Sequence, residues 1–410
     1  MTRSTIFGSL ARLPRGIWAL GLTSLLMDAS SELVHALLPI YLTAVLGVGM
    51  ATLGLLEGLA EATSLITKVF SGWLSDRLGH RKWLTVAGYA LAALTKPAFP
   101  LAESAGPVFA ARFIDRVGKG IRGAPRDALV ADLVEPPLRG AAYGLRQALD
   151  SVGAVLGPLA AIGLMLAFAD DLRTVLWFAV IPALLAVGVL IAGVEEPPRA
   201  EATATATAVA GARRPPIGRA DLRRLPARYW SAAALGAVFV IARFPEAFLI
   251  VRGHEVGLRS AWVPIVLVVM SLTYALSAYP AGAASDRIGT RGLLMAGLMV
   301  LAGAHLCLAL SQGIAGVLAG AAAWGLHMGL TQGLLSRLVA DAVPADLRGT
   351  AFGVFGLATG LATLLGGGLA GLLWEAVGAH LTFGAGAVLA LVAAIGLACR
   401  GSVDRRSGAA

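Results

Sequence analysis

Ionisable side chains recur at helical spacing inside long apolar stretches of this chain. Asp28, Glu32 and His35 follow one another at intervals of four and three residues, so a helix would carry all three on one face. An ionisable group at bilayer depth costs at least ~2.5–3.5 kcal/mol, so such groups normally face an aqueous path and have a role. Carboxyl groups in that position can bind and release protons as the surrounding water changes. We therefore expect Asp28 and Glu32 to carry protons.

Other polar and ionisable residues lie within further apolar segments. They are Glu57, Glu61, Arg112, Asp115, Arg116, Lys119, Arg146, Gln147, Asp150, Arg243, Glu246, His327 and Gln332. Most of the ionisable ones belong to the first half of the chain, so we place proton coupling there. Arg112 and Arg116 are the expected neighbours of Asp28 and Glu32, because a nearby cation favours an ionised carboxylate.

A structural interpretation stands beside this functional one. The same side chains could form static ion pairs that only hold helices together, Glu57 and Glu61 with Lys68 among them, or Arg243 with Glu246 one turn away. Histidines in apolar helices are often simply packed and hydrogen-bonded. His35 with Asp28 and Glu32 does offer nitrogen and oxygen ligands suited to a divalent metal. A second histidine nearby is missing, so no resident metal site is predicted.

The composition places the chain among membrane proteins. Of its 410 residues 57% are hydrophobic and 14% are charged, with a mean hydropathy of +0.78. Soluble proteins carry roughly a quarter charged residues. The net charge of +9 could indicate nucleic acid binding, but the basic residues gather at the ends of apolar runs, as in the positive-inside pattern of membrane proteins. We therefore expect membrane lipid and no nucleic acid as a partner.

Twelve apolar runs are long enough to span a bilayer as helices. They cover residues 17–45, 50–73, 83–102, 107–131, 141–168, 173–194, 229–251, 261–283, 292–311, 314–338, 350–373 and 380–399. With the N-terminus in the cytoplasm, twenty basic residues fall on the cytoplasmic side and three on the other. This asymmetry predicts a multi-pass protein of the bacterial inner membrane with both termini in the cytoplasm.

Two pairs of segments show that the chain is one unit written twice. Residues 129–144 and 338–353 agree at ten of sixteen positions, and residues 72–79 match 282–289 at nearly the same separation. Such a duplication in a very apolar chain is typical of the two halves of a transporter. We predict six-helix halves at 1–194 and 229–400, a cytoplasmic linker at 195–228 and a cytoplasmic tail at 401–410.

The segment from Gly72 to Lys82, GWLSDRLGHRK, closely resembles the motif between helices 2 and 3 of the major facilitator superfamily. The resemblance covers nearly the whole chain and implies an all-α membrane protein of twelve helices in two pseudo-symmetric halves. It also implies that helices 1, 4, 7 and 10 line a central cavity, which agrees with the distribution of the charged residues. Arg112 or Arg116 could match that family's intramembrane arginine of helix 4.

The resemblance further implies a latch that closes the cytoplasmic side while the cavity opens outward. Its residues would be Gly72, Asp76, Arg77, Gly79, Arg81, Asp132, Arg139, Asp286, Arg287, Asp341 and Arg348. Gly153, Gly157 and Pro158 resemble the helix 5 motif of the family's antiporters and exporters. A proline inside a helix removes a backbone hydrogen bond and bends it, so this segment could be a hinge, with plain close packing as the alternative.

These observations together predict a secondary transporter and not an enzyme. We expect proton-coupled efflux of a small polar or charged solute by alternating access, by a protein that works as a monomer. Gly118-Lys119-Gly120 does not complete a phosphate-binding loop, so the proton gradient is the expected energy source and no cofactor is expected. The alternatives are export of a divalent cation such as nickel or cobalt, import of a polar metabolite with protons, and a membrane sensor that transports nothing.

Overall fold

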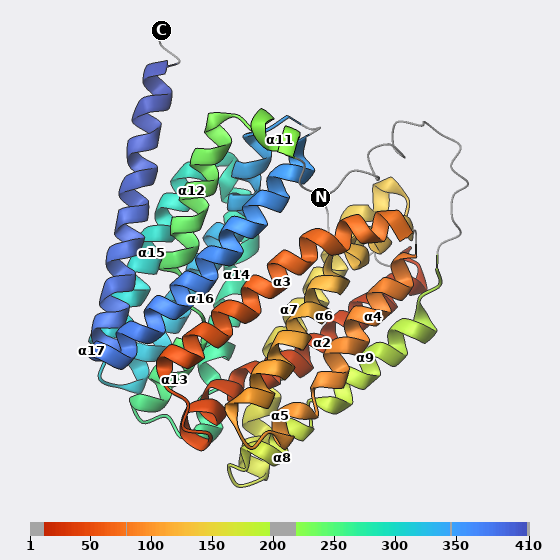
Figure 1. Cartoon of the computed structure of the whole chain (residues 1–410), viewed down its shortest axis with the longest axis vertical. Coiled ribbons are helices and arrows are strands. Elements are labelled where there is room, and N and C mark those ends of the chain that lie inside the picture. Colours follow the sequence, from red (N-terminus) through yellow and green to blue (C-terminus); the bar gives the residue numbers. More distant parts are fainter. Residues whose placement is uncertain (1–11, 79, 197–218, 345–346, 408–410) are drawn as a thin grey trace. The chain divides into compact units, whose positions relative to one another are not determined.

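The computed structural model describes residues 12–78, 80–196, 219–344 and 347–407. This part of the chain is helical throughout, with short connections between successive helices (Figure 1). Because lipid offers no hydrogen-bond partners, a spanning segment must satisfy its backbone internally, and long helices do so.

The helices follow the predicted spans closely. In the first half they are α2 (Arg15–Ile40) with the π-helix η1 (Tyr41–Val45), α3 (Met50–Leu78), α4 (Arg81–Thr95), α5 (Ala98–Leu101), α6 (Ala105–Asp132), η2 (Pro136–Leu138), α7 (Arg139–Ala167), α8 (Leu172–Trp177) and α9 (Val180–Gly193). In the second half they are α11 (Arg219–Arg224), α12 (Ala227–Ala242), α13 (Ala247–Glu255), η3 (Ser260–Trp262), α14 (Ile265–Ile288), α15 (Thr290–Leu310), α16 (Ile314–Asp341) and α17 (Arg348–Ser407).

Prolines and glycines interrupt these helices at identifiable places. Pro97 has no N–H to continue α4, and the chain restarts as α5. Gly378, with a φ of 81°, divides α17 into two helices. Asp171 caps α8, because its carboxylate accepts the backbone N–H groups of Arg173 and Thr174. Counting the interrupted helices as one each and α17 as two, the described chain contains about twelve long helices, which confirms the predicted fold class.

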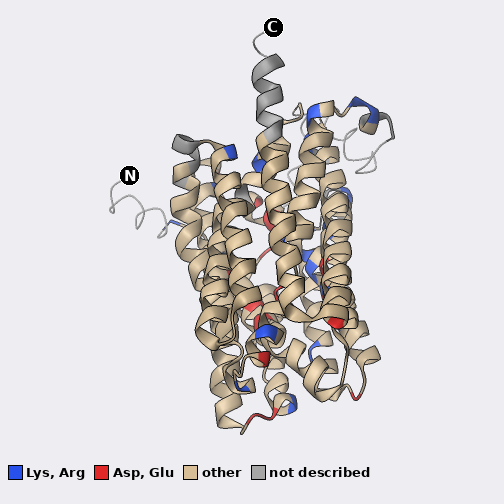
Figure 2. Ribbon diagram, turned by 90° about the vertical axis from the view of Figure 1, so that its left-hand side faces the viewer, with Lys and Arg blue, Asp and Glu red and all other residues tan. Residues whose placement is uncertain are grey.

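Eight segments of the described chain are long and apolar enough to cross a membrane by composition alone. Neither α3 nor α6 is among them, since both carry several charged side chains. In Figure 2 the ribbon is mostly uncharged, and acidic and basic positions occur within the helices as well as at their ends. Helices of adequate length that nevertheless hold charge are where a path for polar solutes is expected.

The chain consists of two compact units, each with most of its contacts inside itself. Unit 1 comprises Met1–Leu37 with Thr63–Gly218, and unit 2 comprises Leu38–Ala62 with Arg219–Ala410. The core of unit 1 is built from α2, α4, α6, α7 and α9, with Leu20, Tyr89 and Leu129 fully buried. In unit 2, α14 packs on α16, and α17 packs on α12 and α15. Residues 38–62 therefore group with the second half, a feature that the sequence repeat does not reveal.

The predicted halves, 1–194 and 229–400, remain predictions about the repeat. Most of the predicted linker, at 197–218, lies outside the described residues, as does the end of the tail at 408–410. The described end of the linker region forms α11, followed by α12 from Ala227.

Candidate functional site

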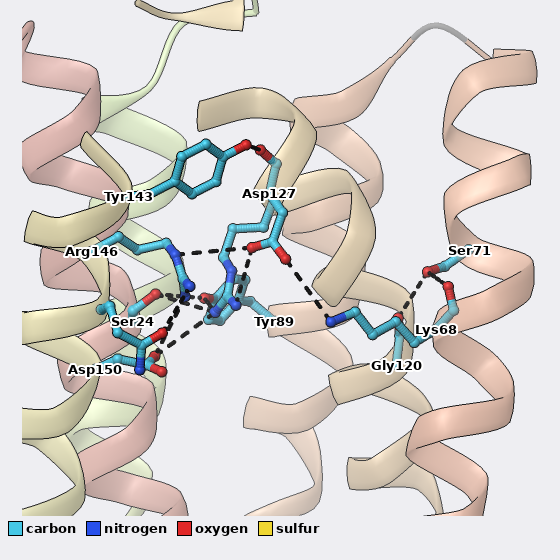
Figure 3. A network of polar contacts seen from close by, with 11 residues as sticks. Ser24, Lys68, Ser71, Tyr89, Gly120, Asp127, Tyr143, Arg146 and Asp150 are labelled. Atoms are coloured by element: carbon cyan, nitrogen blue, oxygen red, sulfur yellow. Dashed lines mark hydrogen bonds and ion pairs between the residues drawn. The ribbon is translucent and has the colours of Figure 1, made fainter. Parts of the chain in front are cut away.

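Unit 1 contains a group of acidic and basic side chains that we call the arginine–aspartate cluster. Its members are Asp28 of α2, Arg122, Arg126 and Asp127 of α6, and Arg146 and Asp150 of α7. Figure 3 shows how Asp127, Arg146 and Asp150 lie around Ser24 and Tyr89. Three helices far apart in the sequence thus present charge to one place.

Arg126 Nη2 donates to the neighbouring Asp127 Oδ1 at 3.4 Å, but the ion pairs that join different helices of the cluster are longer. Arg122 Nη2 lies 4.0 Å from Asp28 Oδ1, and Arg126 Nη1 lies 3.9 Å from Asp150 Oδ1. Arg146 approaches both Asp127 and Asp150 at 3.9 Å. These distances balance charge but exceed those of a hydrogen bond.

Tyr89 of α4 supports the arginines from one side. Its fully buried ring lies 4.4 Å from the guanidinium carbon of Arg122, a cation–π contact. Its hydroxyl lies 3.4 Å from Arg126 Nη1 and 3.3 Å from Ser24 Oγ. The guanidinium groups of α6 are therefore held in place by α4 and α2.

Asp28 and Asp150 form a pair of carboxyl groups at the centre of the cluster. A Cβ on Gly153, one turn after Asp150 in α7, would lie 3.1 Å from the Cβ of Asp28, so both carboxyl groups belong to the contact between α7 and α2. Arg122 lies 4.0 Å from Asp28, and Arg126 and Arg146 lie 3.9 Å from Asp150. Two ionised carboxylates close together repel each other, so neighbouring carboxyl groups favour sharing a proton.

Glycines of α7 make this approach feasible. A Cβ on Gly153 would lie 2.5 Å from the carbonyl oxygen of Leu25, and one on Gly157 would lie 2.6 Å from that of Ala29. The same added atoms would meet the Cβ atoms of Asp28 and Glu32 at 3.1 and 2.8 Å. The α7 motif therefore seats that helix directly on the stripe of α2 that carries both carboxylates.

Glu32 and His35 pair within α2. The distance from His35 Nδ1 to Glu32 Oε2 is 3.2 Å, and Lys119 and Arg116 of α6 also act electrostatically on Glu32. We expected Arg112 and Arg116 beside both carboxylates. The structure puts Arg122, and not Arg112 or Arg116, in an ion pair with Asp28 at 4.0 Å.

Asp115 belongs to a separate, closed ion pair. Lys96 Nζ donates to Asp115 Oδ1 at 2.9 Å and to Ser31 Oγ at 3.1 Å, and both charged side chains are almost fully buried. Arg112 and Arg116 are buried on the same helix and act electrostatically on Asp115. This pair has the short geometry of a structural ion pair that ties α4 to α6 and α2.

The sequence missed several members of the site. Lys68 pairs with Asp127 at 3.9 Å, where we had expected it near Glu57 and Glu61. Tyr143 donates to the backbone carbonyl of Asp127 at 2.6 Å. Gln147, which was among the predicted residues, accepts from Arg146 at 3.2 Å. Asp127 directly follows Arg126 and could have been noticed from its position, whereas nothing in the sequence indicates Tyr89, Tyr143 or Ser24.

The remaining predicted residues belong to unit 2. Glu57 is buried and Glu61 half-buried on α3. His327 lies against the carbonyl of Gly297 at 2.8 Å and stacks on Phe239, the arrangement of a packed histidine, while Gln332 is exposed. Arg243 and Glu246 are not one helical turn apart as expected, because the helix is interrupted between α12 and α13.

The latch residues are only partly visible. Arg81 Nη1 lies 2.5 Å from Asp132 Oδ2, so the start of α4 is tied to the end of α6. Asp132 and Arg139 share one copy of the repeated segment, and Asp341 and Arg348 share the other, which suggests two equivalent pairs. The structure instead places Asp341 3.9 Å from Arg337. Gly72 faces Ala124, and Arg77 lies over the Trp73 ring. Gly79 and the side chains of Asp76, Asp286 and Arg287 lie outside the described part of the structure.

Comparison with known proteins places the chain in a family. Residues 20–251 and 247–408 match the Major Facilitator Superfamily, and both matches together cover nearly the whole chain. The chain belongs to this superfamily. It is therefore a membrane transporter and not an enzyme, and proteins of this family carry small solutes.

Relatives with similar sequences include proteins without a known substrate. An uncharacterized MFS-type transporter of Methanocaldococcus jannaschii is 29% identical over 93% of this chain and 94% of its own length. An uncharacterized protein of Mycobacterium tuberculosis is 30% identical over 88% of this chain and 87% of its own. The multidrug resistance protein MdtH of Yersinia enterocolitica is 30% identical over 42% of each chain.

Solved structures agree on the fold. The nucleoside transporter NupG superposes with a TM-score of 0.77 at 14% identity, over 94% of this chain and 99% of that protein. A bacterial homologue of the lysosomal transporter Spinster gives 0.72 at 16% identity, over 93% and 95% of the two chains. At these identities the similarity establishes the fold alone.

Proposed function

We propose that this chain is a proton-coupled exporter of a small polar or charged solute, working in the bacterial inner membrane with both termini in the cytoplasm. The proposal rests on the closeness of Asp28 and Asp150, on the packed helices α2 and α7, among the arginines of α6 and α7. A pair that holds one proton can release it when the surrounding charges or water change. Antiport follows if solute and proton occupy this place in turn.

The packing of α7 supports coupling between the pair and a movement of helices. Gly153 and Gly157 bring α7 into backbone contact with α2 beside Asp28 and Glu32, and Pro158 follows directly. Any bend or shift of α7 would alter the distance between the two carboxyl groups, since each belongs to one of these helices. The pair would then bind its proton more tightly in one conformation than in the other.

The outward direction is supported by the similarity to MdtH over part of the chain and by the α7 motif. The Arg81–Asp132 ion pair supports a latch at the end where α4 begins and α6 ends. In the proposed orientation this end is cytoplasmic. Breaking and remaking this ion pair would accompany each transport cycle.

Reconstituted vesicles with an imposed pH gradient test the proposal. Added candidate solutes should produce a proton flux in the wild-type protein, and Asp28→Asn or Asp150→Asn should reduce it at least about tenfold. Glu103→Gln, which neutralises an exposed carboxylate in the connection between α5 and α6, is the matched control and should leave the flux unchanged. Solute-driven proton flux that persists in Asp28→Asn would show that the pair does not carry the proton.

The same assay separates the alternatives. Protons that move with the solute, and not against it, would make the protein a symporter. Divalent export is tested by adding Ni²⁺ or Co²⁺ as the solute, since the contact of Glu32 with His35 supplies one oxygen and one nitrogen ligand. Among the described residues, no group of three or more His, Cys, Asp or Glu is arranged to hold a metal ion.

A further inference from the structure

The guanidinium groups of the arginine–aspartate cluster are buried but incompletely hydrogen-bonded. Arg122 is 4% exposed and Arg146 is 8% exposed. Arg122 Nη1, Arg126 Nε, and Nε and Nη1 of Arg146 have no hydrogen-bond acceptor within the described part of the chain. A buried donor without an acceptor costs about 1–3 kcal/mol, and more when it is charged. Four such donors in one cluster require an explanation.

A network of ion pairs that only holds helices together would not leave these four donors without acceptors. In the same unit, Lys96 and Asp115 close to 2.9 Å and Lys96 reaches Ser31 as well, so that pair satisfies itself. In the cluster, the carboxylates lie 3.9–4.0 Å from Arg122 and Arg146, and the guanidinium of Arg122 lies over the ring of Tyr89. The carboxylates therefore balance the charge of these arginines without accepting their hydrogen bonds. The four N–H donors remain available to another acceptor.

The surrounding charges favour an acceptor that is negative. Away from the ends of the long helical segments of unit 1, basic side chains outnumber acidic ones by eight to five. The basic ones are Lys68, Lys96, Arg112, Arg116, Lys119, Arg122, Arg126 and Arg146, and the acidic ones are Asp28, Glu32, Asp115, Asp127 and Asp150. Lys68 and Lys119 are exposed, but among the buried and half-buried side chains the basic ones still outnumber the acidic ones by six to five. An excess of positive charge at such depth is costly without a counter-charge, which an anionic group would supply.

We infer that Arg122, Arg126 and Arg146 bind an oxyanion group, a carboxylate or a phosphate, of the transported solute. Guanidinium groups match such oxygens with paired hydrogen bonds, which a lysine or a neutral donor cannot do. The free donors come from both α6 and α7, so one bound group would join the two helices. This assignment rests on the proposed function, because it takes the cluster to be where the solute binds.

The proposed exchange of solute for protons also indicates a second charged group on the solute. A proton and a solute exclude each other only if the solute competes for the carboxyl pair, and a cationic amine is the group that does so. Asp28 lies 4.0 Å from Arg122, and Asp150 lies 3.9 Å from Arg126 and Arg146, so one small molecule can contact both kinds of group. The solute is therefore a zwitterion with an amine and an oxyanion group.

The test measures thermal unfolding of the purified full-length protein with matched compounds. The zwitterions are the twenty amino acids and 2-aminoethyl phosphate, which separate carboxylate from phosphate. Each is compared with a derivative that lacks one charge: the N-acetyl form keeps only the oxyanion, and the amide or alcohol keeps only the amine. At least one zwitterion should stabilise the protein, and both of its derivatives should bind at least about tenfold more weakly.

Variants of the cluster's arginines test whether the stabilising zwitterion binds at this cluster. Arg122→Gln and Arg146→Gln should each weaken binding of the stabilising zwitterion at least about tenfold. Arg146→Lys, which keeps the charge but not the paired donors, should also weaken it and guards against variants that fail to fold. Arg337→Gln removes an exposed arginine of α16 and should bind like the wild type.

The outcomes separate the two proposals. If no zwitterion or N-acetyl compound stabilises the protein, or if the Arg146 variants bind like the wild type, the oxyanion site is wrong. If N-acetyl compounds bind as well as zwitterions and the Arg146 variants lose both, the oxyanion site stands and the amine assignment fails. If zwitterions bind at the arginines but drive no proton flux in vesicles, the oxyanion site stands and the proposed antiport fails.

Discussion

At the scale of residues, the charged side chains of unit 1 differ in the distance to their oppositely charged partners. Lys96 and Asp115 lie in hydrogen-bond contact and balance each other, whereas Arg122 and Asp28 stay 4.0 Å apart. A short buried pair is hard to break, while a long pair exchanges partners easily. The closed pair is therefore suited to holding helices and the open cluster to binding.

Asp171 provides a prediction at this scale, outside the membrane-spanning segments. Hydrogen bonds from Thr174 and from the backbone at the start of α8 lower the pKa of its carboxyl group below 3.8. A lowered pKa in the folded state contributes stability above the unfolded pKa, and that contribution is lost as pH falls through the folded pKa. We expect Asp171→Ala to cost about 1 kcal/mol as a lost helix cap.

Thermal unfolding of the two proteins between pH 7 and pH 3 measures this cost. The difference in unfolding temperature should be present at pH 7 and should shrink as the pH falls below about 4. A difference that is the same at both ends of this range would show that the ionised carboxylate is not what caps α8.

At the scale of elements, glycines decide how closely helices pack. Gly157 of α7 lies against Ala29 and Glu32 of α2, whereas Gly163 of the same helix has open space around its Cα. Gly157→Ala should push α7 away from α2, at a cost of about 1–3 kcal/mol for overpacking, and should separate Asp150 from Asp28. Gly163→Ala changes the same residue type in the same helix and should have little effect.

Stability in detergent and solute-driven proton flux check this pair of variants. Gly157→Ala should lower the unfolding temperature and reduce the proton flux, while Gly163→Ala should match the wild type in both. Equal behaviour of the two variants would mean that the contact between α7 and α2 is not required for coupling.

The ion pair between α4 and α6 provides a second prediction at this scale. Asp132→Arg places two cations together and should slow transport, because the ends of the helices can no longer pair. The exchanged double variant, Arg81→Asp with Asp132→Arg, restores opposite charges and should recover at least part of the rate. Transport rates in vesicles decide this, and a double variant as slow as the single one would argue against a latch.

At the scale of the whole molecule, residues 38–62 are notable because they precede the predicted linker but pack with helices of the second half. They include the first half of α3, which packs on α17: a Cβ on Gly54 would lie 2.1 Å from the carbonyl oxygen of Gly367. Glu375 of α17 accepts the backbone N–H of Ala51 at 3.1 Å. Because α3 and α17 come from different predicted repeats, the alternating access that we propose would require this contact to open.

Cysteines at Ala62 and Gly360 test that requirement. A Cβ on Gly360 would lie 3.8 Å from the Cβ of Ala62, within the range of a disulfide. With Cys307 and Cys399 replaced by serine, oxidation should stop transport by the double-cysteine variant and reduction should restore it. Each single-cysteine variant should be insensitive to oxidant. Undiminished transport after complete cross-linking would show that α3 and α17 stay together throughout the cycle.

The amino-acid sequence alone determined the class, the number of helices and the family. These depend on features that are local along the chain: apolar runs of spanning length, the GWLSDRLGHRK segment and its second copy. The periodicity of Asp28 and Glu32 also indicated correctly that both lie on one face of α2. Membrane helices are readable in this way because the bilayer sets their length and forbids unpaired backbone groups.

Only the tertiary structure decided which charges meet. Sequence spacing places Arg112, Arg116 and Arg122 on one helix, but sliding a neighbouring helix by one turn of about 5.4 Å changes which of them faces Asp28. The same holds for Asp132, which pairs with Arg81 and not with the nearer Arg139. Packing between helices, set by residues such as Gly153, Gly157 and Tyr89, chooses among these partners, since contacts between distant segments leave no periodic trace in the sequence.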